Sequence, residues 1–205
     1  MDFSSNSPVL VIVALVISIT VHEMMHAFTA HWLGDDTAHE QGRVSLNPLR
    51  HIDPFLTIIL PVATYLLIGF PLLAAKPVPF NPSKVKFGEF GAALIGIAGP
   101  FTNLALALVA GLLLRGFGVN MSLLAFNFLK VFTQLNVALF VFNMIPIPPL
   151  DGSRLLYAFA PEPIQEAMAR LEQFGIFIVF ALVLAVPAFS TILVNINQAV
   201  LRFVV

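Results

Sequence analysis

Long apolar runs separated by short polar stretches dominate this sequence. A bilayer core about 30 Å thick needs roughly 20 apolar residues in a helix, and three runs meet that length. They predict membrane-spanning helices at about 8–33, 91–114 and 123–145. A shorter apolar run predicts a fourth span at about 174–189, directly after an amphipathic stretch at 162–172. Residues 191–205 are too few and too mixed for a span, and one interpretation places them in the membrane interface.

Two further segments depart from this pattern. The apolar residues 54–75 are interrupted by Pro61, Gly69 and Pro71, which suits a re-entrant segment better than a continuous helix. In the polar loop after the first helix, the alternation of apolar and polar residues over 42–48 indicates a short β element. That stretch is either a plain loop or an edge strand on which an extended peptide could pair.

The composition places the chain in a membrane. Of its 205 residues, 59% are hydrophobic and only 10% are charged, whereas soluble domains carry roughly 25% charged residues. We therefore expect an all-α polytopic membrane protein, with one domain over residues 1–205 embedded in the lipid bilayer. The net charge of −1 is not that of a basic, nucleic-acid-binding protein, and the absence of cysteine excludes metal sites with thiolate ligands. The first helix should be retained, because no basic signal-peptide region precedes it.

The residues with the clearest chemistry lie inside the first apolar run. His22 and His26 are four residues apart, so on a helix both imidazoles share one face and can bind one metal ion. A charged side chain at mid-membrane costs about 2.5–3.5 kcal/mol on insertion scales, and a bound zinc ion is the simplest way to offset that cost. Glu23 would lie beside the metal, where it can take a proton from water. A purely structural pair of histidines is the less favoured alternative.

A third metal ligand must come from another part of the chain, because catalytic zinc usually has three protein ligands and one open position. Asp151 is the candidate, since apart from Glu23 it is the one acid that adjoins an apolar span with unusual backbone. Residues 143–152 contain three prolines, which remove N–H donors and force an extended chain. Such backbone is tolerated at membrane depth only inside protein or beside a wet cavity, so we expect it at the site.

Together these motifs resemble the site-2 protease family of intramembrane zinc metalloproteases, in its compact bacterial form without a PDZ-like domain. The resemblance rests on HExxH, on GPFTN at residues 99–103, and on NMIPIPPLDG at residues 143–152. It implies that His22, His26 and Asp151 bind one zinc ion (Zn2+) per chain, and that Glu23 is the general base. It also implies a catalytic role for Asn143, which would orient the substrate or stabilise an oxyanion.

Both halves of such a site must lie at the same depth, and this requirement constrains the topology. If the first helix ends on one side of the membrane, residues 54–75 must leave that side and return to it. The same side carries most of the basic residues outside the spans, namely Arg43, Arg50, Lys76, Lys84, Lys86 and Arg154. By the positive-inside rule it is cytoplasmic, so we expect a multi-pass protein of the cell membrane with its active site towards the cytoplasm.

The favoured function is therefore an endopeptidase that cuts other membrane proteins within or near their transmembrane segments, as in regulated intramembrane proteolysis. Two alternatives are a metal-binding transporter or sensor and a catalytically inactive scaffold. The lack of an inverted repeat argues against a transporter, and the intact Glu23 argues against an inactive scaffold. Asn103 and Asn136 are interpreted as interhelical hydrogen-bond partners, and Gly96 and Gly99 as packing positions. The oligomeric state and the selection of substrates are left open.

Overall fold

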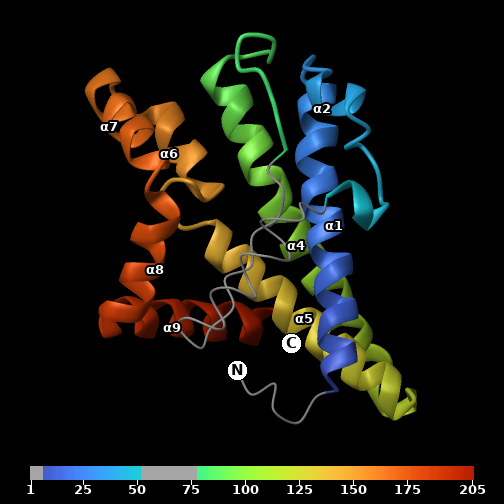
Figure 1. Ribbon diagram of the computed structural model, residues 1–205. Coiled ribbons are helices and arrows are strands. Elements are labelled where there is room, and N and C mark those ends of the chain that lie inside the picture. Colours follow the sequence, from blue (N-terminus) through green and yellow to red (C-terminus); the bar gives the residue numbers. More distant parts are fainter. Residues whose placement is uncertain (1–6, 52–77) are drawn as a thin grey trace.

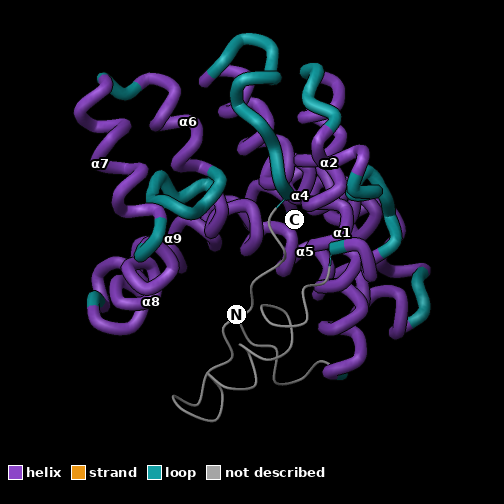
Figure 2. Tube along the Cα trace, turned by 45° about the horizontal axis from the view of Figure 1, so that its top comes forward, coloured by secondary structure: helices purple, strands orange, loops and turns teal. Residues whose placement is uncertain are grey.

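The computed structural model describes residues 7–51 and 78–205, and every regular element in these ranges is a helix (Figures 1 and 2). The α-helices are α1 (Pro8–Trp32), α2 (Thr37–Glu40), α4 (Glu89–Phe117), α5 (Leu123–Asn143), α6 (Gly152–Phe159), α7 (Glu162–Glu172), α8 (Gly175–Ala185) and α9 (Pro187–Val204). Two short 3-10 helices are also described. The first, η1 (Pro48–Arg50), lies in the polar loop after α2, and the second, η3 (Gly118–Asn120), directly follows α4. The predicted all-α class is confirmed over these residues.

Helices α1, α4 and α5 are the three long spans that the apolar runs predicted. They contain 25, 29 and 21 residues, so at about 1.5 Å per residue each can cross the bilayer core. Local signals explain where they begin. Pro8 occupies the first turn of α1, where its missing N–H leaves no bond unmade. Ser122 caps α5, because its hydroxyl accepts a hydrogen bond from the N–H of Ala125.

The fourth predicted span, at about 174–189, is not one continuous helix. Helix α8 has only 11 residues, which is too short for the bilayer core. It ends at Ala185, and Pro187 begins α9, which includes most of the tail that the sequence left unassigned. Helices α7 and α8 qualify as a span only when counted together, and they are bent by 85° relative to each other. Among the described residues there are thus three spans, or four with this bent pair.

The short β element predicted at 42–48 is not found, because the described backbone there forms turns and bends. Local hydrogen bonds account for the difference. The N–H of Ser45 donates to the carbonyl of Arg43 at 2.9 Å, and the carbonyl of Ser45 accepts from Nε2 of His51 at 2.8 Å. The side chain of Asn47 accepts from the N–H of Leu49 at 3.0 Å, which starts η1. Backbone groups engaged in this way do not form the free edge of a strand.

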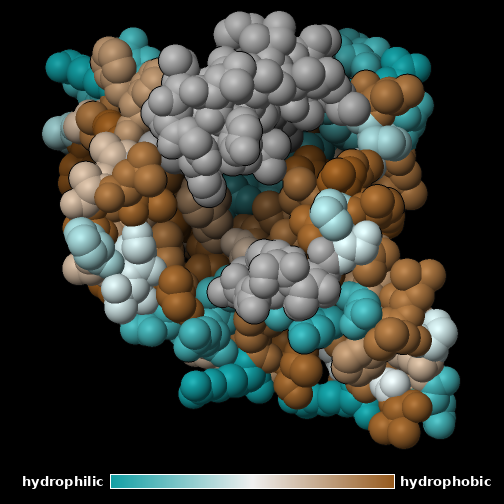
Figure 3. Space-filling view, turned by 60° about the horizontal axis from the view of Figure 1, so that its bottom comes forward, coloured by the Kyte–Doolittle hydropathy of each residue, from teal (hydrophilic) through white to brown (hydrophobic). Residues whose placement is uncertain are grey.

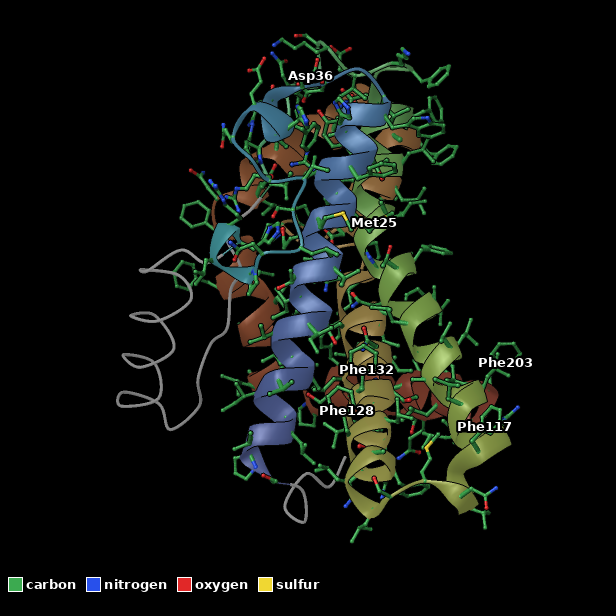
Figure 4. The ribbon with its side chains drawn as sticks, turned by 90° about the vertical axis from the view of Figure 1, so that its right-hand side faces the viewer. Met25, Asp36, Phe117, Phe128, Phe132 and Phe203 are labelled. Atoms are coloured by element: carbon green, nitrogen blue, oxygen red, sulfur yellow. The ribbon has the colours of Figure 1, made fainter. Side chains whose placement is uncertain are left out.

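The three spans pack against one another as a bundle. Their shared core includes Ala14 of α1, Ala110 of α4, and Val131 and Phe132 of α5. In Figure 4, Asp36 marks the end of α1 and Phe117 marks the end of α4, and these two ends lie at opposite ends of the bundle. Helix α4 therefore runs antiparallel to α1, as two spans do when the end of one and the start of the next lie on the same side.

The loop that precedes α4 is bound to the end of α1. The N–H of Lys86 donates to the carbonyl of Leu33 at 2.9 Å, and the N–H of Asn81 donates to the buried carboxylate of Asp35. Burial alone would raise the pKa of Asp35, but hydrogen bonds from Thr37 and Asn81 hold it below its usual value. The chain therefore leaves α1 and enters α4 at the same end, as the topology argument requires. The predicted re-entrant segment 54–75 itself lies outside the described residues.

Large apolar side chains are exposed around the bundle (Figure 3). Examples that are 58–64% exposed are Val9, Ile12, Val109 and Leu112. In water such surface would favour association, since burying it gains about 25 cal/mol per Å², whereas lipid tails are as apolar as the side chains themselves. Together with the three long spans, this surface makes the chain a multi-pass membrane protein.

Candidate active site

Helix α1 brings His22, Glu23 and His26 together in the interior of the bundle. All three side chains are buried, with 6–8% of each residue exposed. Because His22 and His26 are one helical turn apart, their rings meet edge to face, with an interplanar angle of 85° and centroids 4.6 Å apart. Their Nε2 atoms lie 3.0 Å from each other. The helical spacing therefore does aim both imidazoles at one point.

Asp151 brings a carboxylate to the same point from a different part of the chain. It precedes α6 directly, in the proline-rich turn that follows α5. Its Oδ2 lies 3.2 Å from Nε2 of His22 and 3.4 Å from Nε2 of His26. The irregular segment 143–152 thus places Asp151 beside the histidines. The segment is only partly buried, because Pro146 and Pro149 are exposed whereas Pro148 and Leu150 are buried.

These three atoms have the spacing of a tetrahedral metal site. Zinc binds histidine nitrogen and carboxylate oxygen at about 2.0–2.2 Å, which places tetrahedral ligand atoms about 3.3 Å apart. The measured separations of 3.0, 3.2 and 3.4 Å lie around that value. Among the described residues, His22, His26 and Asp151 form a group that could hold a metal ion. The donor set of two imidazoles and one carboxylate therefore fits a zinc ion.

The other ring nitrogens explain why both Nε2 atoms are available as ligands. Nδ1 of His26 lies 2.6 Å from the carbonyl oxygen of Ile95, which can only accept, so this nitrogen carries the hydrogen. Nδ1 of His22 lies 2.6 Å from Oδ1 of Asn103 and donates to it in the same way. In a neutral imidazole the second nitrogen is then unprotonated. Both Nε2 lone pairs consequently face each other and Asp151, an arrangement that a bound cation would stabilise.

Gly99 of α4 makes room for this arrangement. A Cβ atom at this position would overlap Nε2 of His26 and would lie 2.7 Å from Nε2 of His22. Gly96, one turn earlier, allows a similarly close approach of the Asp151 carbonyl, which would be 3.0 Å from a Cβ there. The sequence interpretation treated both glycines as general packing positions. The structure shows that Gly99 packs directly against the two candidate ligands.

We expect Gly99→Ala to lower zinc content and peptidase activity sharply, although it removes no ligand. The added methyl would displace one or both imidazoles, and zinc content of the purified protein measures this directly. Gly116→Ala is the matched control on the same helix, because a Cβ there meets nothing within 4 Å. That control should keep its zinc and gain about 0.5–1 kcal/mol in helix stability. Normal zinc content in Gly99→Ala would contradict the observed packing.

The remaining predicted residues are placed differently. Glu23 follows His22 on α1 and is buried beside the candidate ligands, as a general base would be. Asn143 ends α5, and its side-chain amide donates to the carbonyl of Leu139 in its own helix at 3.0 Å. No described hydrogen bond joins Asn143 to the histidines or to Asp151. Its catalytic role therefore stays a prediction.

A second group of histidines lies near the end of α1. His31, Asp36 and His39 are exposed, and their ligand atoms lie within 4.8 Å of one another. However, the rings of His31 and His39 are stacked, with an interplanar angle of 18°. A metal ion lies in the plane of each imidazole that binds it, so stacked rings do not converge on one ion. We assign no metal site to this group.

Comparison with known proteins agrees with the geometry. The sequence profile of peptidase family M50 matches residues 10–186. The chain is 40% identical to "Putative zinc metalloprotease YwhC" of Bacillus subtilis over 190 residues, which are 89% of this chain and 83% of that protein. It is 32% identical to "Putative zinc metalloprotease Rip2" of Mycolicibacterium smegmatis, over 89% of this chain and 69% of the relative. No solved structure matches the chain.

Proposed function

The chain belongs to peptidase family M50, and on that basis we propose that it is an intramembrane zinc metalloendopeptidase. The observation that carries the proposal is the meeting of His22, His26 and Asp151 inside a bundle of apolar helices. A transporter or sensor is not favoured, because the family match covers most of the chain and the relatives are named as metalloproteases.

We assign one zinc ion per chain to Nε2 of His22, Nε2 of His26 and Oδ2 of Asp151. When bound, zinc supplies Lewis acidity, which lowers the pKa of water towards 7 and polarises a carbonyl group. With three protein ligands, such an ion would remain accessible to these reactants. The HExxH sequence and the buried environment of Glu23 agree with a catalytic site rather than a purely structural one.

Glu23 is the general base of the proposed reaction. Its carboxylate takes a proton from the attacking water as the new C–O bond forms at the scissile carbonyl carbon. It then passes the proton to the departing amine nitrogen as the C–N bond breaks. Asn143 would orient the substrate or donate a hydrogen bond to the carbonyl oxygen, which gains negative charge during the attack.

The substrates that we propose are transmembrane segments of other membrane proteins. The candidate site lies on a membrane-spanning helix, so a substrate reaches it from within or near the bilayer. A peptide bond in an intact helix has its carbonyl hydrogen-bonded and shielded. The substrate must therefore unwind locally before its scissile carbonyl group can enter the site.

A cleavage assay in liposomes with a panel of single-span substrates tests this function. We expect cleavage within or near the span, and we expect a zinc chelator to stop it. Added zinc should restore it. Cleavage of soluble peptides alone would contradict the proposal that membrane segments are the substrates.

The proposed topology predicts that residues 41 and 83 lie on the cytoplasmic side. Gln41→Cys and Ser83→Cys introduce exposed thiols into a chain that has no cysteine, so labelling has no native background. Both should react with a membrane-impermeant reagent only from the cytoplasm. Asn120→Cys, in the loop at the far end of α4, is the control and should react only from the opposite side. Labelling of 41 and 83 from different sides would contradict the topology.

A further inference from the structure

A chain of buried polar groups runs from the candidate metal ligand His22 through the three spanning helices. Nδ1 of His22 contacts Oδ1 of Asn103 on α4 at 2.6 Å. Nδ2 of Asn103 donates to Oδ1 of Asn136 on α5 at 2.8 Å. Nδ2 of Asn136 donates to the hydroxyl of Ser18 at 2.8 Å, and that hydroxyl donates to the carbonyl of Ala14 at 2.7 Å. This series of hydrogen bonds thus starts and ends on α1.

Carbonyl groups fix the direction of every bond in this chain. The Ala14 carbonyl can only accept, so the Ser18 hydroxyl gives its hydrogen there and accepts from Asn136. The Asn136 amide also donates to the Phe132 carbonyl at 2.9 Å, which places the Asn136 oxygen towards Asn103. If the side-chain amide of Asn103 or Asn136 were turned over, two donors or two acceptors would face each other in this series of hydrogen bonds. Asn103 must therefore present its oxygen to His22.

Because the polar side chains are buried, reversing the direction of these hydrogen bonds would be costly. Ser18, Asn103 and Asn136 are all 0% exposed. A buried polar group without a partner costs about 1–3 kcal/mol, and these fully buried side chains are out of contact with bulk solvent. Simple interhelical attraction would explain the three polar residues, but it would not require that the chain end on a ring nitrogen of a candidate metal ligand.

We propose that Asn103 is a positioning residue that holds His22 with hydrogen on Nδ1 and its Nε2 lone pair towards the metal, and that Asn136 and Ser18 orient Asn103. This inference rests on the proposed zinc site. Partners of this kind, placed behind a metal ligand, typically change metal affinity by 10- to 100-fold when they are removed. Packing of the three helices thus becomes a determinant of zinc affinity.

Zinc affinity of the metal-free protein, measured by competition with a chromophoric chelator in detergent, tests the inference without relying on activity. Asn103→Leu and Asn103→Asp both remove the amide donors, but only Asp keeps an acceptor for His22. We expect Asn103→Leu to bind zinc about 10- to 100-fold more weakly than wild type, and Asn103→Asp to recover most of that loss. Thr102→Val is the matched control, because the described hydrogen bond of its hydroxyl goes to the Ala98 carbonyl in the same helix and not to His22.

A double-mutant cycle tests whether Asn136 acts through Asn103. Asn136→Leu alone should weaken zinc binding less than Asn103→Leu, and it should have no further effect in the Asn103→Leu background. Equal affinities of Asn103→Leu and Asn103→Asp would overturn the inference, as would additive losses in the double variant. If Asn103→Leu does not fold, wild-type zinc affinity in Asn136→Leu overturns it instead. A wild-type protein that binds zinc but cleaves nothing would refute the proposed function and leave these comparisons valid.

Discussion

Glu23→Gln should abolish peptide hydrolysis while the protein keeps its zinc and its fold. Glutamine has nearly the shape of glutamate, but its amide cannot accept the proton of the attacking water. General acid–base catalysis typically contributes 10²- to 10⁴-fold, so we expect a loss of about that size in turnover. Cleavage of a single-span substrate in liposomes and zinc content of the same preparation measure the two effects separately.

The comparison with Glu40→Gln controls for the loss of a negative charge from this part of the chain. Glu40 lies in α2, outside the spanning helix, and should tolerate the change without loss of activity. Full activity in Glu23→Gln would exclude Glu23 as the general base. Loss of zinc in that variant would instead assign the carboxylate to the metal, in place of the role in proton transfer.

Asp151→Ala should release the metal, although Asp151 lies far from the HExxH motif in the sequence. Its Oδ2 completes the group with the two histidines at 3.2 and 3.4 Å, so its removal leaves two protein ligands. Zinc content should fall from about one ion per chain to a small fraction of that, and activity should fall with it. Metal analysis of the purified variant gives the answer directly.

Asp36→Ala is the matched control for this experiment. Asp36 is an exposed acid that pairs with His31 near the end of α1, away from the candidate zinc ligands. It should keep wild-type zinc content, because an exposed ion pair contributes little to the fold. Unchanged zinc in Asp151→Ala would remove Asp151 from the metal site and would leave the third ligand to another residue.

Local patterns in the sequence were enough to predict the three long spans and the pairing of His22 with His26. The length of an apolar run and a spacing of four residues on a helix depend only on residues close together in the chain. The same kind of reasoning was not confirmed at 42–48, where the described backbone forms turns and bends, nor fully at 174–189, where a fourth span is counted only as the bent pair of α7 and α8. At 42–48, hydrogen bonds of Ser45 and Asn47 replaced the strand, and at 174–189, Pro187 began a new helix.

Only the tertiary structure decided how the rest of the site is built. Asp151, Asn103 and Gly99 come from segments far from α1 in sequence, and no local pattern determines which atoms of theirs meet the histidines. Helix packing decides it, because neighbouring helices approach closely only where small residues such as Gly99 allow it. Sequence therefore identified the two ligands that share one helix and proposed Asp151 as the third, whereas packing determined the partner of His22 and the space in which both histidines turn towards Asp151.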